Sequence, residues 1–177
     1  MGKKVLVLGE IRHGELRNVS FEAIAAAKQI ADGGEVVGLL LGENGTNLAN
    51  ELIQYGADRI VIVEHEKLNV FTPDAYSQAI LQVIDKEDPE GFILGHTSIG
   101  RDISPRIAAK LKSGLISDVV NVEVSGDEVI FTRPIYSGKV FEKKVITEGL
   151  IFATIRPNNI PSLIKDETRS GEVTSID

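Results

Sequence analysis

Residues 91–112 have the sequence GFILGHTSIGRDISPRIAAKLK, in which a glycine-containing loop joins a short apolar run to an amphipathic stretch. The run Gly91–Leu94 has almost no polar alternation, which is typical of a strand buried on both faces of a sheet. From about Asp102 to Lys112 the apolar residues recur at helical spacing, and Pro105 is tolerable there because it falls in the first turn of the predicted helix. The stretch therefore predicts a strand, a loop and a helix in succession.

The same alternation fills the first hundred residues. Three further apolar runs predict buried strands: Lys4–Leu8, Glu35–Leu41 and Arg59–Val63. Between them, we expect one helix capped by Ser20 and ended by Asp32-Gly33-Gly34, one from about Thr46 to Tyr55, and one that begins at Thr72-Pro73. Strands alternating with helices predict an α/β fold, a Rossmann-like three-layer sandwich with a mostly parallel sheet.

After Gly114 the pattern changes to strands joined by tight turns. The expected strands are Asp118–Val124, Glu128–Arg133, Val140–Thr147 and Leu150–Ile155. We expect them to extend the sheet in antiparallel fashion. From Lys165 onward the chain is polar and lacks a burial pattern, so residues 1–161 are predicted to form the domain and residues 162–177 a tail or the start of an interdomain linker.

Composition restricts the function. The 177 residues carry a net charge of −7, with only nine aromatic residues, counted as three Tyr and six Phe, and no tryptophan, which disfavours a nucleic acid partner. The apolar runs are strand-sized and Met1–Lys4 leads straight into a strand, so we expect no signal peptide, transmembrane segment or membrane insertion. The absence of cysteine favours the cytoplasm or an organelle matrix. The three histidines lack metal-ligand spacing, so no metal site is predicted.

The loop Gly95–Asp102 is the first candidate site, because ligands of open α/β sheets collect at the carboxyl ends of the strands. It is close to the phosphate-binding pattern G-x-x-x-x-G-K-[ST], but Arg101 replaces the lysine and Asp102 replaces the hydroxyl residue, which argues against ATP hydrolysis. The candidate anion or nucleotide residues are Gly95, Thr97, Ser98, Gly100 and Arg101. The alternative is structural, with Asp102 or Ser104 capping the helix.

The sequence contains no complete pattern of catalytic residues. The loop after the first strand contains Glu10, Arg12 and His13 but lacks the G-x-G-x-x-G spacing, and these side chains are interpreted as a solvated loop. The string G-x-S-x-G of a serine nucleophile does not occur. We therefore predict no catalytic residues and no enzymatic activity of the chain itself.

A second candidate is the turn Arg133–Lys139, which places two cations and an aromatic side chain between two strands. It is either a plain β-turn with surface charges or a docking surface, since arginine and tyrosine often anchor protein interfaces. The candidate interface residues are Arg133, Tyr136 and Lys139.

Four segments together resemble a known family. They are VLVLGEIRHGELRNVSFEAIAAAKQIA (5–31), GHTSIGRDISPRIAAKLKSGLISDV (95–119), FTRPIYSGKV (131–140) and ATIRPN (153–158). In this order they resemble the N-terminal domain of the α-subunit of electron-transfer flavoproteins, over roughly residues 3–161.

The resemblance implies an α/β heterodimer that carries electrons from dehydrogenases through FAD. It also implies that most of the FAD site lies in a C-terminal domain whose motifs have no match here, so no FAD-binding residue is carried over. AMP, where the family binds it, is implied chiefly for the β-subunit. The leading hypothesis is thus a non-catalytic scaffold domain. The alternatives are a stand-alone AMP- or ATP-binding module that uses residues 95–102, and a structural homo-oligomeric domain that pairs through a sheet edge.

Overall fold

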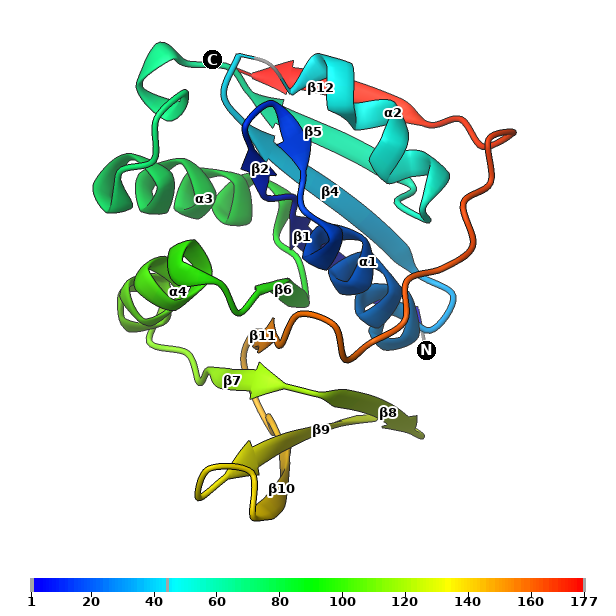
Figure 1. The fold of residues 1–177 in the computed structure, drawn as a ribbon, viewed down its shortest axis with the longest axis vertical. Helices are drawn as coiled ribbons and strands as arrows, with labels where there is room; N and C mark the ends of the chain where they lie inside the picture. The colour runs from blue at the N-terminus through cyan, green and yellow to red at the C-terminus, as the bar shows by residue number, and fades with distance from the viewer. Residues whose placement is uncertain (1, 44, 177) are drawn as a thin grey trace.

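A seven-stranded parallel sheet forms the centre of the computed structural model, which describes residues 2–43 and 45–176 (Figure 1). The strand order is β12-β5-β4-β1-β6-β11-β7, and every pairing is parallel. The strands are β1 (Lys4–Leu8), β4 (Glu35–Leu41), β5 (Arg59–Val63), β6 (Gly91–Gly95), β7 (Ile116–Val119), β11 (Ile151–Ile155) and β12 (Glu172–Ile176).

Helices cover both faces of this sheet, so the predicted three-layer α/β sandwich is confirmed. On one face lie α1 (Asn18–Ala31) and α2 (Thr46–Gln54), and on the other lie α3 (Pro73–Glu87) and α4 (Ser98–Leu111) (Figure 1). A short 3-10 helix, η1 (Glu66–Leu68), precedes α3. Each face has its own apolar core, because both sides of the strands carry buried aliphatic side chains.

The antiparallel strands form a sheet of their own rather than an extension of the central one. This small sheet has the order β10-β9-β8, with β8 (Asn121–Ser125), β9 (Glu128–Ile135) and β10 (Val140–Val145), and lies at one end of the molecule (Figure 1). The strand predicted from Asp118 to Val124 is divided at Val120 into β7 and β8, and Asp118, with a left-handed φ of 64°, lies within β7, where the pairing with β11 shifts register. Both β7 and β11 join the central sheet in parallel.

Two predicted helix starts were wrong. Helix α4 begins at Ser98, four residues before Asp102, and Thr97 caps it by accepting a hydrogen bond from the Gly100 amide at 3.1 Å. Pro105 therefore lies in the helix interior, where its missing N–H costs one intrahelical bond. Ser20 lies inside the first turn of α1 rather than at its cap, and its Oγ accepts a hydrogen bond from the Glu10 amide at 2.8 Å.

The carboxyl-terminal segment also differs from the predicted tail or linker, since residues 172–176 form the edge strand β12 on β5. The segment just before β12 is fixed by Arg169. Its guanidinium donates hydrogen bonds to the carbonyls of Ile53, Gly56 and Ala57 at 2.9 to 3.3 Å. An edge strand is largely exposed and therefore shows no burial pattern in the sequence. The domain boundary near residue 161 stays a prediction. Within residues 2–43 and 45–176, no helix has the length and apolar character needed to cross a membrane.

Candidate functional site

The loops that follow β1 and β6 meet at the carboxyl edge of the sheet, where the sequence predicts the site. The Thr97 hydroxyl donates to Glu10 Oε1 at 2.5 Å, and Arg17 Nη1 donates to Glu10 Oε2 at 3.1 Å. Glu10 is buried, so its interpretation as a solvated loop residue was wrong, whereas Arg12 and His13 are exposed as expected. The buried carboxylate ties the two loops together, 87 residues apart in the sequence.

The glycines of the candidate loop bring helix α4 close to strand β6. A Cβ atom on Gly100 would overlap the carbonyl oxygen of Gly95. The Gly100 amide is bound to the capping Thr97, and Arg101 and Ser98 are exposed. The hydrogen bond between the Gly100 amide and the Thr97 hydroxyl therefore holds the loop itself in place. Binding of an anion or nucleotide by this loop stays a prediction.

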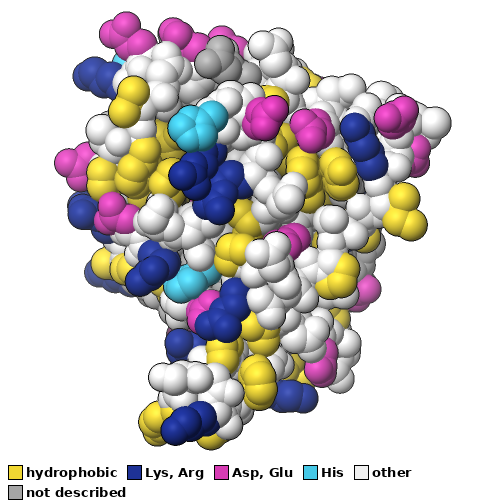
Figure 2. Space-filling model, in the orientation of Figure 1, with side chains coloured by type: hydrophobic (Ala, Val, Ile, Leu, Met, Phe, Trp, Pro, Cys, Tyr) yellow, Lys and Arg dark blue, Asp and Glu magenta, His cyan; other side chains and the backbone are white. Residues whose placement is uncertain are grey.

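A second polar cluster lies beside this loop, at the ends of β6, β7 and β11. Thr154 Oγ1 lies 2.9 Å from His96 Nδ1 and accepts a hydrogen bond from the Asp118 amide at 2.9 Å. The Asp118 carboxylate in turn accepts two bonds from Arg156, at 2.8 and 2.5 Å. Figure 2 shows basic and histidine side chains following one another down the middle of the face drawn there, with acidic ones among them.

Burial lowers the pKa of His96 below its ordinary value of 6.5. The cations Arg101, Arg156 and Arg133 act in the same direction, and the Asp118 carboxylate opposes them. At pH 7 the neutral imidazole of His96 is therefore the favoured form in the folded chain.

Lowering the pH should reduce the stability of the folded chain, because His96 must then take up a proton. Below about pH 6.5 the unfolded chain binds a proton at this residue more readily than the folded chain does, so the free energy of unfolding falls as pH falls. We expect His96→Gln to reduce this pH dependence between about pH 7 and pH 5. Urea unfolding at several pH values measures it, and equal slopes for the two proteins would contradict the assignment.

The turn Arg133–Lys139 lies beside the same cluster. Its residues Tyr136, Ser137 and Gly138 have positive φ angles of 51°, 57° and 83°, as a tight hairpin turn requires. A hollow of about 490 Å³ is lined by Asp118, Arg133, Pro134, Ile135, Tyr136, Ser137, Gly138 and Arg156. The structure thus brings Arg133 and Tyr136 together with two residues that the sequence reasoning missed, Asp118 and Arg156, whereas Lys139 is exposed and outside this lining.

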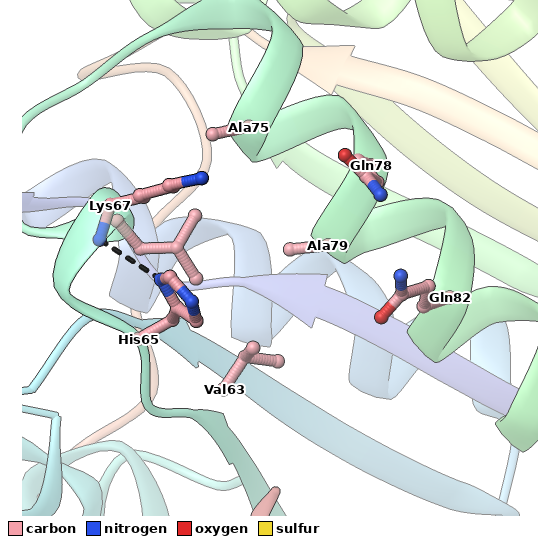
Figure 3. Close-up of a pocket in the computed structure, with 8 residues that line it drawn as sticks. Val63, His65, Lys67, Ala75, Gln78, Ala79 and Gln82 are labelled. Atoms are coloured by element: carbon pink, nitrogen blue, oxygen red, sulfur yellow. Dashed lines mark hydrogen bonds between the residues drawn. The ribbon is translucent and has the colours of Figure 1, made fainter. Parts of the chain in front are cut away.

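A different hollow, of about 250 Å³, lies between the end of β5, η1 and α3 (Figure 3). His65 and Lys67 line one side, where His65 Nδ1 accepts a hydrogen bond from the Lys67 amide at 3.1 Å, and Gln78 and Gln82 of α3 line the other. Among the described residues, no carboxylate lines this hollow. In the described part of the chain, no group of three or more His, Cys, Asp or Glu side chains could hold a metal ion.

Comparison with known proteins gives the family. Residues 5–177 match the model of the electron transfer flavoprotein domain. The chain is 58% identical over 177 residues to the electron transfer flavoprotein subunit alpha of Bacillus subtilis, covering all of this chain and 54% of that protein. It is 37% identical over 130 residues to the acryloyl-CoA reductase electron transfer subunit beta of Anaerotignum propionicum, covering 72% of this chain and 35% of that protein. The chain spans about half the length of the curated relatives first matched.

Proposed function

This chain belongs to the electron transfer flavoprotein domain family, and from that premise we propose that it is the N-terminal scaffold domain of an α-subunit that supports FAD-mediated electron transfer. The observation that carries the proposal is the 58% identity to a subunit alpha, which extends along all 177 residues. The scaffold would act within an α/β heterodimer that receives electrons from dehydrogenases, and would supply no catalytic residue of its own. The lack of cysteine supports a location in the cytoplasm or an organelle matrix.

The relatives are about twice as long as the matched region, and we place most of the FAD site in their additional part. Two observations on this chain support that placement. The loop after β1 lacks the glycine spacing that lets a backbone approach a pyrophosphate, and the loop after β6 uses Thr97 and Gly100 to cap its own helix. AMP, if the assembly binds it, would lie chiefly in the β-subunit.

The small sheet is the part we assign to docking of the β-subunit. Tyr136 and Phe141 are 76% and 63% exposed there, and Val140 and Val145 are also exposed. Arg133 and Lys139 provide the charged rim of the same hairpin. Exposed aromatic side chains beside an arginine are the usual composition of an interface centre.

Tyr136→Ala should weaken binding of the β-subunit by about thirtyfold or more, because truncation of an aromatic hot-spot residue costs about 2 kcal/mol or more. Isothermal titration of the chain with the β-subunit of the same organism measures the affinity. Val70→Ala is the matched control, since Val70 is 75% exposed and belongs to the segment between η1 and α3, which lies well away from the small sheet (Figure 1). Equal affinities for the two variants would remove the hairpin from the interface.

A second candidate function is a stand-alone nucleotide-binding module, favoured by the exposed Arg101 in the first turns of α4 at the carboxyl edge of the sheet. In that case AMP or ATP should bind the isolated chain, and Arg101→Ala should weaken the binding because a phosphate contact is lost. Titration of the isolated chain with AMP and with ATP tests this second function. A wild-type chain that binds neither would eliminate this alternative.

A further inference from the structure

The guanidinium of Arg133 has unused hydrogen-bonding capacity. Its Nε is buried, and the described residues offer this atom no hydrogen-bond partner. The carboxylate of Glu142 is 3.9 Å from Arg133 Nη1, which is an ion pair but too long for a hydrogen bond, and Lys144 lies closer to the same carboxylate at 3.3 Å. The Arg133 side chain is 30% exposed as a whole, so its terminal nitrogens, and not the buried Nε, are the donors open to an additional acceptor.

The lining of the hollow beside Arg133 holds more basic than acidic groups, and Glu142, which pairs with Arg133, lies outside that lining. Of the residues that line its roughly 490 Å³, the charged ones are Arg133, Arg156 and Asp118, which gives two guanidinium groups and one carboxylate. Both Asp118 oxygens are bound by Arg156, so they do not satisfy Arg133. This basic hollow stands out in a chain whose net charge is −7.

Size and chemistry together indicate what could fill it. A volume of this order suits a small molecule. Arginine forks are well matched to the planar oxygens of a carboxylate and to the oxygens of a phosphate. We propose that this hollow is a binding site for a small molecule bearing a carboxylate or phosphate group, which accepts hydrogen bonds from Arg133 and Arg156. This site lies on the hairpin turn and is distinct from the loop 95–102.

The test is a titration of the ¹⁵N-labelled full chain, followed by NMR at constant ionic strength, with sodium phosphate, sodium acetate and AMP as separate probes. We expect saturable shifts at the amides of Ser137, Gly138 and Asp118 for at least one probe. Phosphate alone, acetate alone or AMP alone would identify the source of the anion. Arg133→Gln should weaken that binding by about tenfold, since a charge-assisted bond is lost.

Two controls separate binding from folding. Arg106→Gln changes an exposed arginine of α4 that pairs with Asp102, and should leave the affinity unchanged. Arg133→Lys keeps the positive charge but removes the planar guanidinium with its paired N–H donors, and should retain part of the binding. The urea midpoints of all variants establish that they are folded.

His96 provides an independent readout. It faces Asp118, Arg101, Arg156, Arg133 and the Thr154 hydroxyl, so an added anion should offset the cations and raise the pKa of His96. Its imidazole signals followed over pH, with and without the bound probe, measure the change. The proposal is overturned by non-saturable shifts with all three probes, by equal affinity of Arg133→Gln and the wild type, or by shifts centred on residues 97–101 instead of the hairpin.

Discussion

Gly100→Ala should destabilise the chain by about 3 kcal/mol, because no side chain fits between α4 and β6. The added Cβ would overlap the Gly95 carbonyl, which is backbone and cannot rotate away as a flexible side chain could. Relief would require the start of α4 to move, and with it the contact of Thr97 with Glu10. The free energy of unfolding from urea titration measures the loss.

Gly114→Ala is the matched control for this substitution. A Cβ atom on Gly114 meets no heavy atom within 4 Å, and this residue follows the end of α4 rather than preceding it. We expect a change within about 0.5 kcal/mol. If Gly100→Ala were as stable as Gly114→Ala, the close approach of α4 to β6 would be wrong.

Phe92→Ala should cost about 3–5 kcal/mol, because it leaves a cavity at the centre of the sheet. Phe92 lies on β6 and is fully buried, and its ring centroid is 5.2 Å from that of Phe152 on the neighbouring strand β11. The substitution removes both the buried apolar surface and the ring contact. Thermal and urea unfolding both measure the effect.

Phe141→Ala removes the same side chain from the small sheet, where Phe141 is 63% exposed. Its stability should change by about 0.5 kcal/mol or less, since little buried surface is lost. Its affinity for the β-subunit should fall, since this residue belongs to the proposed docking surface. A Phe141→Ala protein as unstable as Phe92→Ala would show that the hairpin packs on the rest of the chain rather than on a partner.

Three strands of the central sheet could be predicted from the sequence to the residue, and β6 to within one residue. Each of β1, β4 and β5 is one charged residue followed by a buried apolar run, because burial on both faces removes polar residues from the rest of the strand. The three-layer architecture follows from the same alternation of runs and helices.

The remaining elements depend on tertiary contacts, which leave only a weak pattern in the local sequence. Strand β12 is an exposed edge and is held by β5 and by Arg169 rather than by its own apolar side chains. The start of α4 was placed too late because Ser98-Ile99-Gly100-Arg101 resembles a loop, and the cap comes from Thr97. The division between β7 and β8 falls at Val120, an apolar residue that nothing in the local sequence marks as a break.

For the candidate site, the sequence indicated the edge of the sheet where the loops after β1 and β6 meet, but not the residue pairs that join those loops. Thr97 was identified as a candidate, whereas its partner Glu10 was not, since the two residues are 87 positions apart. His96 and Thr154 are 58 positions apart, and the contact arises because β6 and β11 are neighbours in the sheet. Only the strand order reveals such pairs, and the predicted extension of the sheet placed β11 in an antiparallel arrangement.

We propose above all that this chain is a scaffold on which the β-subunit docks. Native mass spectrometry of the chain co-expressed with the β-subunit of the same organism tests it most directly. We expect a 1:1 heterodimer that Tyr136→Ala weakens and Val70→Ala does not. Recovery of the chain only as a 19.2 kDa monomer or as a homodimer, beside a folded β-subunit, would contradict it.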